Sequence, residues 1–106
     1  MKFVYVASPF KNIDREYAFE IARKACEEVE SFDNNFYPVS PVLMWGSLKK
    51  EVTKHERHRN LEACKKLLLK CDFIHVADSE YSKSSEGVQI ELELAKENGI
   101  GKLSIK

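Results

Sequence analysis

This sequence of 106 residues contains no closely spaced pair of cysteines. Its three cysteines, Cys26, Cys64 and Cys71, form no CxxC motif, which argues against a disulfide framework. The three histidines are not spaced with them as zinc ligands, so we expect no metal site and no cofactor. Cys26 and Cys64 fall on apolar stripes of expected helices, where we interpret them as small core residues.

Net charge and long apolar runs are missing as well. The 17 Lys and Arg residues balance the 17 Asp and Glu residues, so duplex nucleic acid, which usually needs a net basic face, is not expected as a partner. No apolar run reaches membrane-spanning length, and the sequence opens on a strand-like segment rather than a signal-peptide pattern. We therefore expect a cytoplasmic protein with no membrane partner.

Nucleotide-binding glycine motifs do not occur either. No GxGxxG or Walker sequence is present, so an ordinary dinucleotide or nucleoside triphosphate site is not indicated. The sequence also has no internal repeat and no low-complexity segment. Its length suits a single domain, residues 1–106.

Strand-like and helix-like segments alternate along the chain. We expect strands at 2–7, 36–40, 72–78 and 102–105, and helices at 13–32, 52–70 and 85–98. We interpret 42–50 as a loop with a short helix, and 79–84 as a mobile polar loop. This order predicts an α/β fold: a small doubly wound, flavodoxin- or Rossmann-like parallel sheet with helices on both faces.

Three loops of such a sheet are expected to meet. Ligands bind beyond the carboxyl ends of the strands, which predicts one crevice between residues 8–11, 41–45 and 78–91. Ser8 and Lys11 could contact a sugar or phosphate there, or form a plain turn. Trp45 could stack on a base or cover the core. In the basic cluster of residues 55–59, Arg57 could face the crevice, although such clusters are usually solvated.

The stretch SEGVQIELELA, residues 85–95, is the most informative motif. Ser85 can cap a helix or donate to a ligand oxygen, and Gly87 lets a ligand approach the backbone closely. Glu91 follows Gly87 by one helical turn and so lies under the same loop. The alternative is that Glu91 is one more exposed carboxylate, like Glu93.

With these motifs in hand, the chain resembles the nucleoside 2-deoxyribosyltransferase-like superfamily, which includes deoxyribosyltransferases and 2'-deoxynucleoside 5'-phosphate N-hydrolases. The resemblance runs nearly end to end through VYVASPF, the proline-bearing second strand, CDFIHVAD and SEGVQIELELA. It is greatest to small members that open with YVASPF and carry a central Glu-Arg pair, here Glu56-Arg57.

The resemblance implies roles for individual residues. It makes Glu91 the nucleophile that attacks the anomeric carbon of the deoxyribose, and Ser85 the ligand of a 5'-phosphate. Active members carry a further aspartate ahead of the one that opens the third strand, and this chain has Cys64 near that place. Glu62 and Asn60 are the only polar stand-ins near it, and Asp78 or Glu62 could replace the aspartate. From the residues and the resemblance together, the expected substrate contacts are Tyr5, Ser8, Pro9, Phe10, Lys11, Trp45, Arg57, Ser85, Gly87 and Val88.

The expected function is therefore cleavage of the N-glycosidic bond of a nucleoside or nucleotide, as a hydrolase or a deoxyribosyltransferase. The alternative is a non-catalytic protein of the same fold that binds a nucleotide or ribosyl metabolite. A sheet with so few strands leaves apolar helix faces uncovered, so we expect a homodimer or a higher homo-oligomer.

Overall fold

The apolar strand β1 (Lys2–Ala7) lies inside a four-stranded parallel sheet in the computed structural model, which describes residues 1–46 and 54–105. The strand order is β2-β1-β3-β4, with β2 at Phe36–Val39, β3 at Phe73–Val76 and β4 at Gly101–Lys102. Tyr5 is in register with Val39 on one side and Ile74 on the other. The predicted α/β class and parallel sheet are confirmed.

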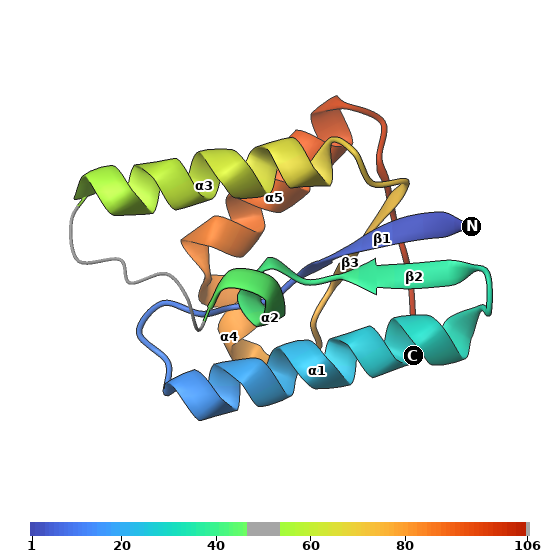
Figure 1. The fold of residues 1–106 in the computed structure, drawn as a ribbon, viewed down its shortest axis with the longest axis horizontal. Coiled ribbons are helices and arrows are strands. Elements are labelled where there is room, and N and C mark those ends of the chain that lie inside the picture. Colours follow the sequence, from blue (N-terminus) through green and yellow to red (C-terminus); the bar gives the residue numbers. More distant parts are fainter. Residues whose placement is uncertain (47–53, 106) are drawn as a thin grey trace.

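Helices cover both faces of the sheet. Helix α1 (Arg15–Phe32) lies on one face, and α3 (Lys54–Leu68) and α5 (Glu86–Glu97) lie on the other (Figure 1). Because side chains alternate across a strand, β1 serves two cores. Val4 and Val6 pack with residues of α1, whereas Tyr5 and Ala7 pack with residues of α3 and α5.

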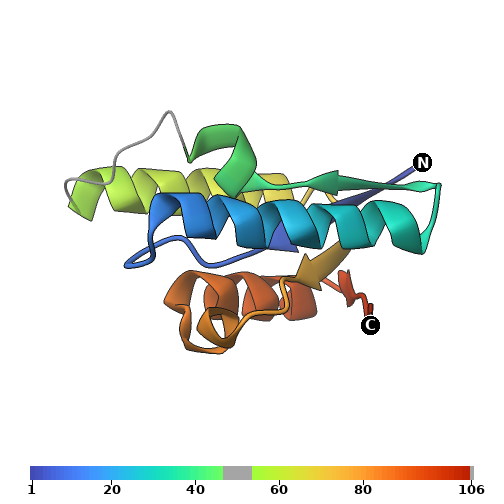
Figure 2. The ribbon, with the colours of Figure 1, turned by 90° about the horizontal axis from the view of Figure 1, so that it is seen from below.

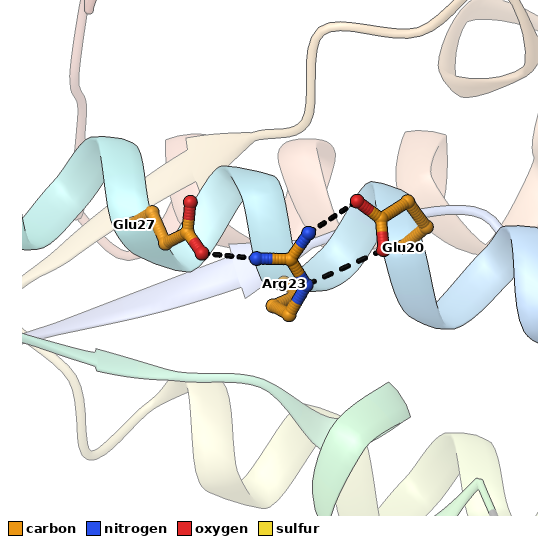
Figure 3. Close-up of polar contacts among 3 residues, drawn as sticks. All are labelled: Glu20, Arg23 and Glu27. Atoms are coloured by element: carbon orange, nitrogen blue, oxygen red, sulfur yellow. Dashed lines mark hydrogen bonds and ion pairs between the residues drawn. The ribbon is translucent and has the colours of Figure 1, made fainter.

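Helix α1 forms as its sequence predicts, with an apolar stripe toward the sheet and a charged outer face. The Asp14 side chain caps it by accepting a hydrogen bond from the Tyr17 amide at 3.2 Å. On the outer face, the Arg23 guanidinium bridges Glu20 and Glu27, one turn away on either side (Figure 3). These exposed contacts support the helix locally and take no part in the site.

Two segments differ from the prediction. Residues 79–84, expected to be a mobile loop, contain helix α4 (Glu80–Ser84), because the buried Ser82 hydroxyl donates to the Ala77 carbonyl at 2.8 Å. The last strand begins earlier than expected, since Gly101 pairs with Phe73. The predictions for 47–50 and for a helix start at 52 lie outside the described residues.

The short helices decide which loops can meet. Helix α2 (Pro41–Trp45) follows β2 and α4 follows β3, and Figure 2 shows them on opposite sides of the molecule. Residues of α2 line the cavity described below, and residues of α4 do not. Among the helices described, none has the length and apolar character that crossing a membrane requires.

Candidate functional site

A buried carboxyl group lies at the centre of the candidate site. Val88, Glu91 and Ala95 form the inward stripe of α5, so the helix turns Glu91 toward the sheet. Only 8% of Glu91 is exposed. The hydroxyl of Tyr5, a fully buried residue of β1, donates a hydrogen bond to Glu91 Oε2. The prediction singled out Glu91 on its spacing, and the structure removes the alternative that it is an exposed helix carboxylate.

Burial changes how these two groups titrate. Loss of water raises the pKa of Glu91 to about 7, and the hydrogen bond from Tyr5 opposes that rise only in part. Burial also raises the pKa of Tyr5, and neighbouring Glu91 and Cys64 raise it further. Tyr5 therefore stays protonated at neutral pH and donates a hydrogen bond without releasing its proton, whereas Glu91 exchanges between its acid and its carboxylate. Such a carboxyl can act as a nucleophile or a base.

Glu91 borders a small cavity. Tyr5, Ser8 and Phe10 line it from β1 and the following loop, Trp45 and Gly46 from α2 and its end, and Asn60 and Cys64 from α3. Its volume is about 140 Å³. An engineered protein cavity of about 150 Å³ accommodates benzene, so this one suits a single ring, either one sugar or one base.

Ser8 supplies an unpaired polar atom to the cavity wall. Its Oγ is buried and has no hydrogen-bond partner within residues 1–46 and 54–105. A buried hydroxyl without a partner is unfavourable, so a ligand hydroxyl or oxygen that reached Ser8 would satisfy it. This favours a ligand-binding role for Ser8 over the alternative that Ser8 only forms a turn.

Aromatic rings form much of the remaining wall. Phe10 and Trp45 both border the cavity, and Phe10 stacks on Phe19 of α1 with ring centroids 6.2 Å apart. Gly46 fits under this stack: a Cβ there would overlap the Val42 carbonyl oxygen and come within 2.8 Å of the Phe19 ring. The prediction left Trp45 open between stacking and covering the core, and the structure places it at the cavity.

The residues of the predicted phosphate cradle, Ser85, Gly87 and Val88, form the start of α5 and do not line the cavity. The Ser85 side chain caps α5 by accepting from the Val88 amide at 3.3 Å, and Val88 itself is buried in the core. At Gly87 a Cβ would meet only Ser85 Oγ, at 3.9 Å. Of the other predicted contacts, Pro9 is buried and Lys11 is exposed, and neither lines the cavity.

Arg57 faces a neighbouring groove between α3 and α5. Lys54, His58 and Glu86 share this groove, and Arg57 Nη2 lies 3.7 Å from Glu86 Oε2. Asn60 and Cys64 line both the groove and the cavity, so the two are adjacent. A ligand in the cavity could extend toward Arg57.

Asp78 lies elsewhere. It lines a separate depression together with Glu28 and Lys24 of α1, and it does not border the cavity of Glu91. The same face of the sheet holds His75, whose Nε2 is 3.2 Å from Glu28 Oε1. The structure therefore does not join Asp78 to Glu91, and Glu62, the other candidate replacement, is exposed and outside the cavity wall.

Asn60 and Cys64 belong to the cavity wall but were not predicted as site residues. They lie one turn apart on α3, so both reach the same wall. The resemblance had pointed to this part of α3, since it placed Cys64 near the family's further aspartate, with Asn60 and Glu62 as the polar stand-ins there. The apolar stripe led us to interpret Cys64 as a core residue, and it also packs against the core cluster that contains Tyr5.

Two comparisons with known proteins bear on this chain. No curated protein matches its sequence. Residues 2–103, nearly the whole chain, match a family of domains, and the protein thus belongs to the family described as Domain of unknown function (DUF7768).

Proposed function

We propose that this protein cleaves the N-glycosidic bond of a nucleoside or nucleoside 5'-monophosphate, with Glu91 as the nucleophile. The observation that carries the proposal is a buried carboxyl group, hydrogen-bonded by Tyr5, in the wall of a cavity that suits one ring. The sequence resemblance to nucleoside 2-deoxyribosyltransferase-like proteins supports the same chemistry.

The proposed reaction uses Glu91 in its ionised form. Breaking the N-glycosidic bond leaves positive charge on the anomeric carbon, which a carboxylate can stabilise or capture as a glycosyl ester. Tyr5 donates to Oε2, so we assign Oε1 as the attacking oxygen. Water then releases the sugar in a hydrolase, and a second base would take its place in a transferase.

The cavity wall provides the binding groups for this reaction. Ser8 Oγ is suited to a sugar hydroxyl because it is buried and lacks a partner in the described chain. Trp45 and Phe10 present aromatic surface on which a base can stack. Since the cavity encloses only one ring, the rest of the substrate extends outward, and the groove at Arg57 is the proposed place for a 5'-phosphate.

The test measures release of free base from the four 2'-deoxynucleosides and their 5'-monophosphates by chromatography. We expect Glu91→Gln to lower the rate by at least about 100-fold, because the amide cannot act as the nucleophile. The matched control is Glu93→Gln, which alters an exposed carboxylate on the same helix and should leave the rate unchanged. Full turnover by Glu91→Gln would remove Glu91 from the proposed role.

A second candidate is a protein that binds such a ligand without cleaving it. It is favoured by one observation: among the described residues that line the cavity, Glu91 is the sole carboxylate. A ligand-dependent rise in melting temperature with no release of base would support this candidate.

We further propose that the protein is a homodimer or higher homo-oligomer. Large apolar side chains on β1, β2 and α2 are exposed in the single chain, including Phe3, Tyr37 and Met44. A second copy of the chain would cover these exposed side chains.

A further inference from the structure

Resting on the proposed role of Glu91, we infer that the cavity takes N-glycosides whose base already carries a positive charge, such as pyridinium N-ribosides. Three features of the described cavity wall lead to this substrate class: its charge, the absence from it of a carboxylic acid or histidine that could protonate the leaving base, and its aromatic side chains.

The charge of the cavity is one-sided. Among the described residues of its wall, Glu91 is the only acidic side chain, and no lysine, arginine or histidine is present. Ionising a buried carboxyl without a countercharge is unfavourable, and a cationic ring in the cavity would supply that countercharge. With a neutral or anionic ring, the ionised Glu91 would keep its hydrogen bond from Tyr5 but would have no countercharge from the described residues of the wall.

Among the described residues, the titratable side chains near Glu91 come from β1 and α3. Tyr5 approaches from β1, and Cys64 lies close to Tyr5 on α3. The cationic residues Lys54, Arg57 and His58 line the adjacent groove, beyond the wall that Asn60 and Cys64 share, where Arg57 is paired with Glu86. None of these three cations borders the cavity itself.

The leaving group supplies a separate argument. A neutral purine or pyrimidine usually needs a proton to depart, and the described cavity wall holds no second carboxyl and no histidine to give one. A pyridinium base needs no proton. Its C1'–N bond breaks, the electron pair moves to nitrogen, and the base leaves neutral.

The remaining bonds balance in the same scheme. One Glu91 oxygen forms an ester bond to C1' as the base departs. Water then attacks C1', the ester bond breaks with its electron pair returning to Glu91, and the water proton passes to solvent. The net reaction converts a pyridinium pentoside and water into pentose, neutral pyridine and a proton.

The aromatic wall suits the same base. Trp45 and Phe10 border the cavity on the α2 side, and an aromatic face attracts a cation more strongly where water is excluded. One aromatic cation is also the size of ring that a cavity of about 140 Å³ accommodates.

Binding of two small probes tests the charge preference without any turnover. The probes are 1-methylnicotinamide, a cation, and nicotinamide, its neutral counterpart, each titrated calorimetrically at pH 6 and pH 8. With the pKa of Glu91 at about 7, the ionised fraction rises about tenfold over this range, so the cation should bind about tenfold more tightly at pH 8. Nicotinamide should show no such gain. Glu91→Gln should abolish the gain, and Glu93→Gln should retain it.

Turnover of nicotinamide riboside, compared with the neutral deoxynucleosides, completes the test. Faster, Glu91-dependent release of nicotinamide supports the inference. If only the neutral nucleosides are cleaved in a Glu91-dependent way, the inference fails and the proposed function stands. If none is cleaved, both fail. Equal affinity for the two probes at both pH values would also overturn the inference.

Discussion

Burial of Glu91 affects stability as well as chemistry, and this can be measured at the scale of one residue. Its pKa rises from 4.5 to about 7 on folding, so the folded state holds more protons than the unfolded state between these pH values. Stability is therefore lost as pH rises through this window, by about 3 kcal/mol in full at pH 8. The side chain of Glu91→Gln does not titrate, so the variant lacks this loss of stability.

We accordingly compare the free energy of unfolding of Glu91→Gln with that of the wild-type chain. The value for Glu91→Gln minus the value for the wild type should increase by about 2 kcal/mol between pH 5 and pH 8. Urea unfolding at the two pH values measures this, with Glu93→Gln as the exposed control. Parallel pH dependence of the wild-type protein and Glu91→Gln would mean that the carboxyl is not desolvated in the folded state.

The sequence predicted some residues of the site and not others, for a physical reason. Ser8, Trp45 and Glu91 were found because each stands at a fixed place relative to a strand end or a helix start. The hydrogen bond between Tyr5 and Glu91 joins residues 86 positions apart, so no local pattern contains it. Asp78 was placed in the same crevice by its position after β3, but the depression that it lines lies on the α1 side.

At the scale of elements, two glycines near the site are expected to behave in opposite ways. A Cβ at Gly46 would overlap the Val42 carbonyl oxygen within α2, whereas one at Gly87 meets ordinary contacts in the first turn of α5. We expect Gly46→Ala to lower the free energy of unfolding by about 1–3 kcal/mol. Gly87→Ala should leave it unchanged or raise it by up to about 1 kcal/mol.

Urea unfolding of both variants checks this contrast. The base-release assay gives a second reading of Gly87→Ala: lower activity in an equally stable variant would assign the start of α5 to ligand binding. A Gly46→Ala variant as stable as the wild-type protein would show that α2 can shift away from Phe19 at little cost.

Elements with a strong periodicity were predictable, and those held by distant contacts were not. Strand β1 was predicted at the bounds that the structure gives, and Pro38 was correctly kept in a strand because β2 lies at the sheet edge. Helix α4 has no apolar period, and its buried Ser82 depends on a bond to the end of β3. Composition alone therefore indicated a loop.

At the scale of the whole molecule, strand order explains where the cavity lies. The chain crosses from β1 to β2 over α1, then returns past β1 to β3 by way of α3, so helices cover opposite faces. The loops after β1 and β2 open toward α3 and α5, which supply Cys64 and Glu91. The alternation of strands and helices predicted this layout, but not the short helix α4 after β3.

The same layout leaves an exposed apolar area on the edge strand β2 and its neighbour β1, which carries the prediction of self-association. Phe3 and Tyr37 are neighbours in register on β1 and β2, with ring centroids 6.5 Å apart, and they are 44% and 58% exposed. Exposed aromatic pairs beside a sheet edge are typical of protein interfaces. We expect the wild-type chain to be a dimer by light scattering over a concentration series.

Replacing Tyr37 with lysine would place a charge in that interface and should shift the dimer toward monomer. The side chain is exposed in the single chain, so the free energy of unfolding of the monomer should change little. Lys11→Ala, at an exposed position in the loop that follows the far end of β1 from Phe3, is the control and should remain dimeric. A wild-type chain that is monomeric at every concentration would contradict the dimer. A Tyr37→Lys dimer as tight as the wild type would place the interface elsewhere, with Leu43 and Met44 of α2 the next exposed apolar surface to test.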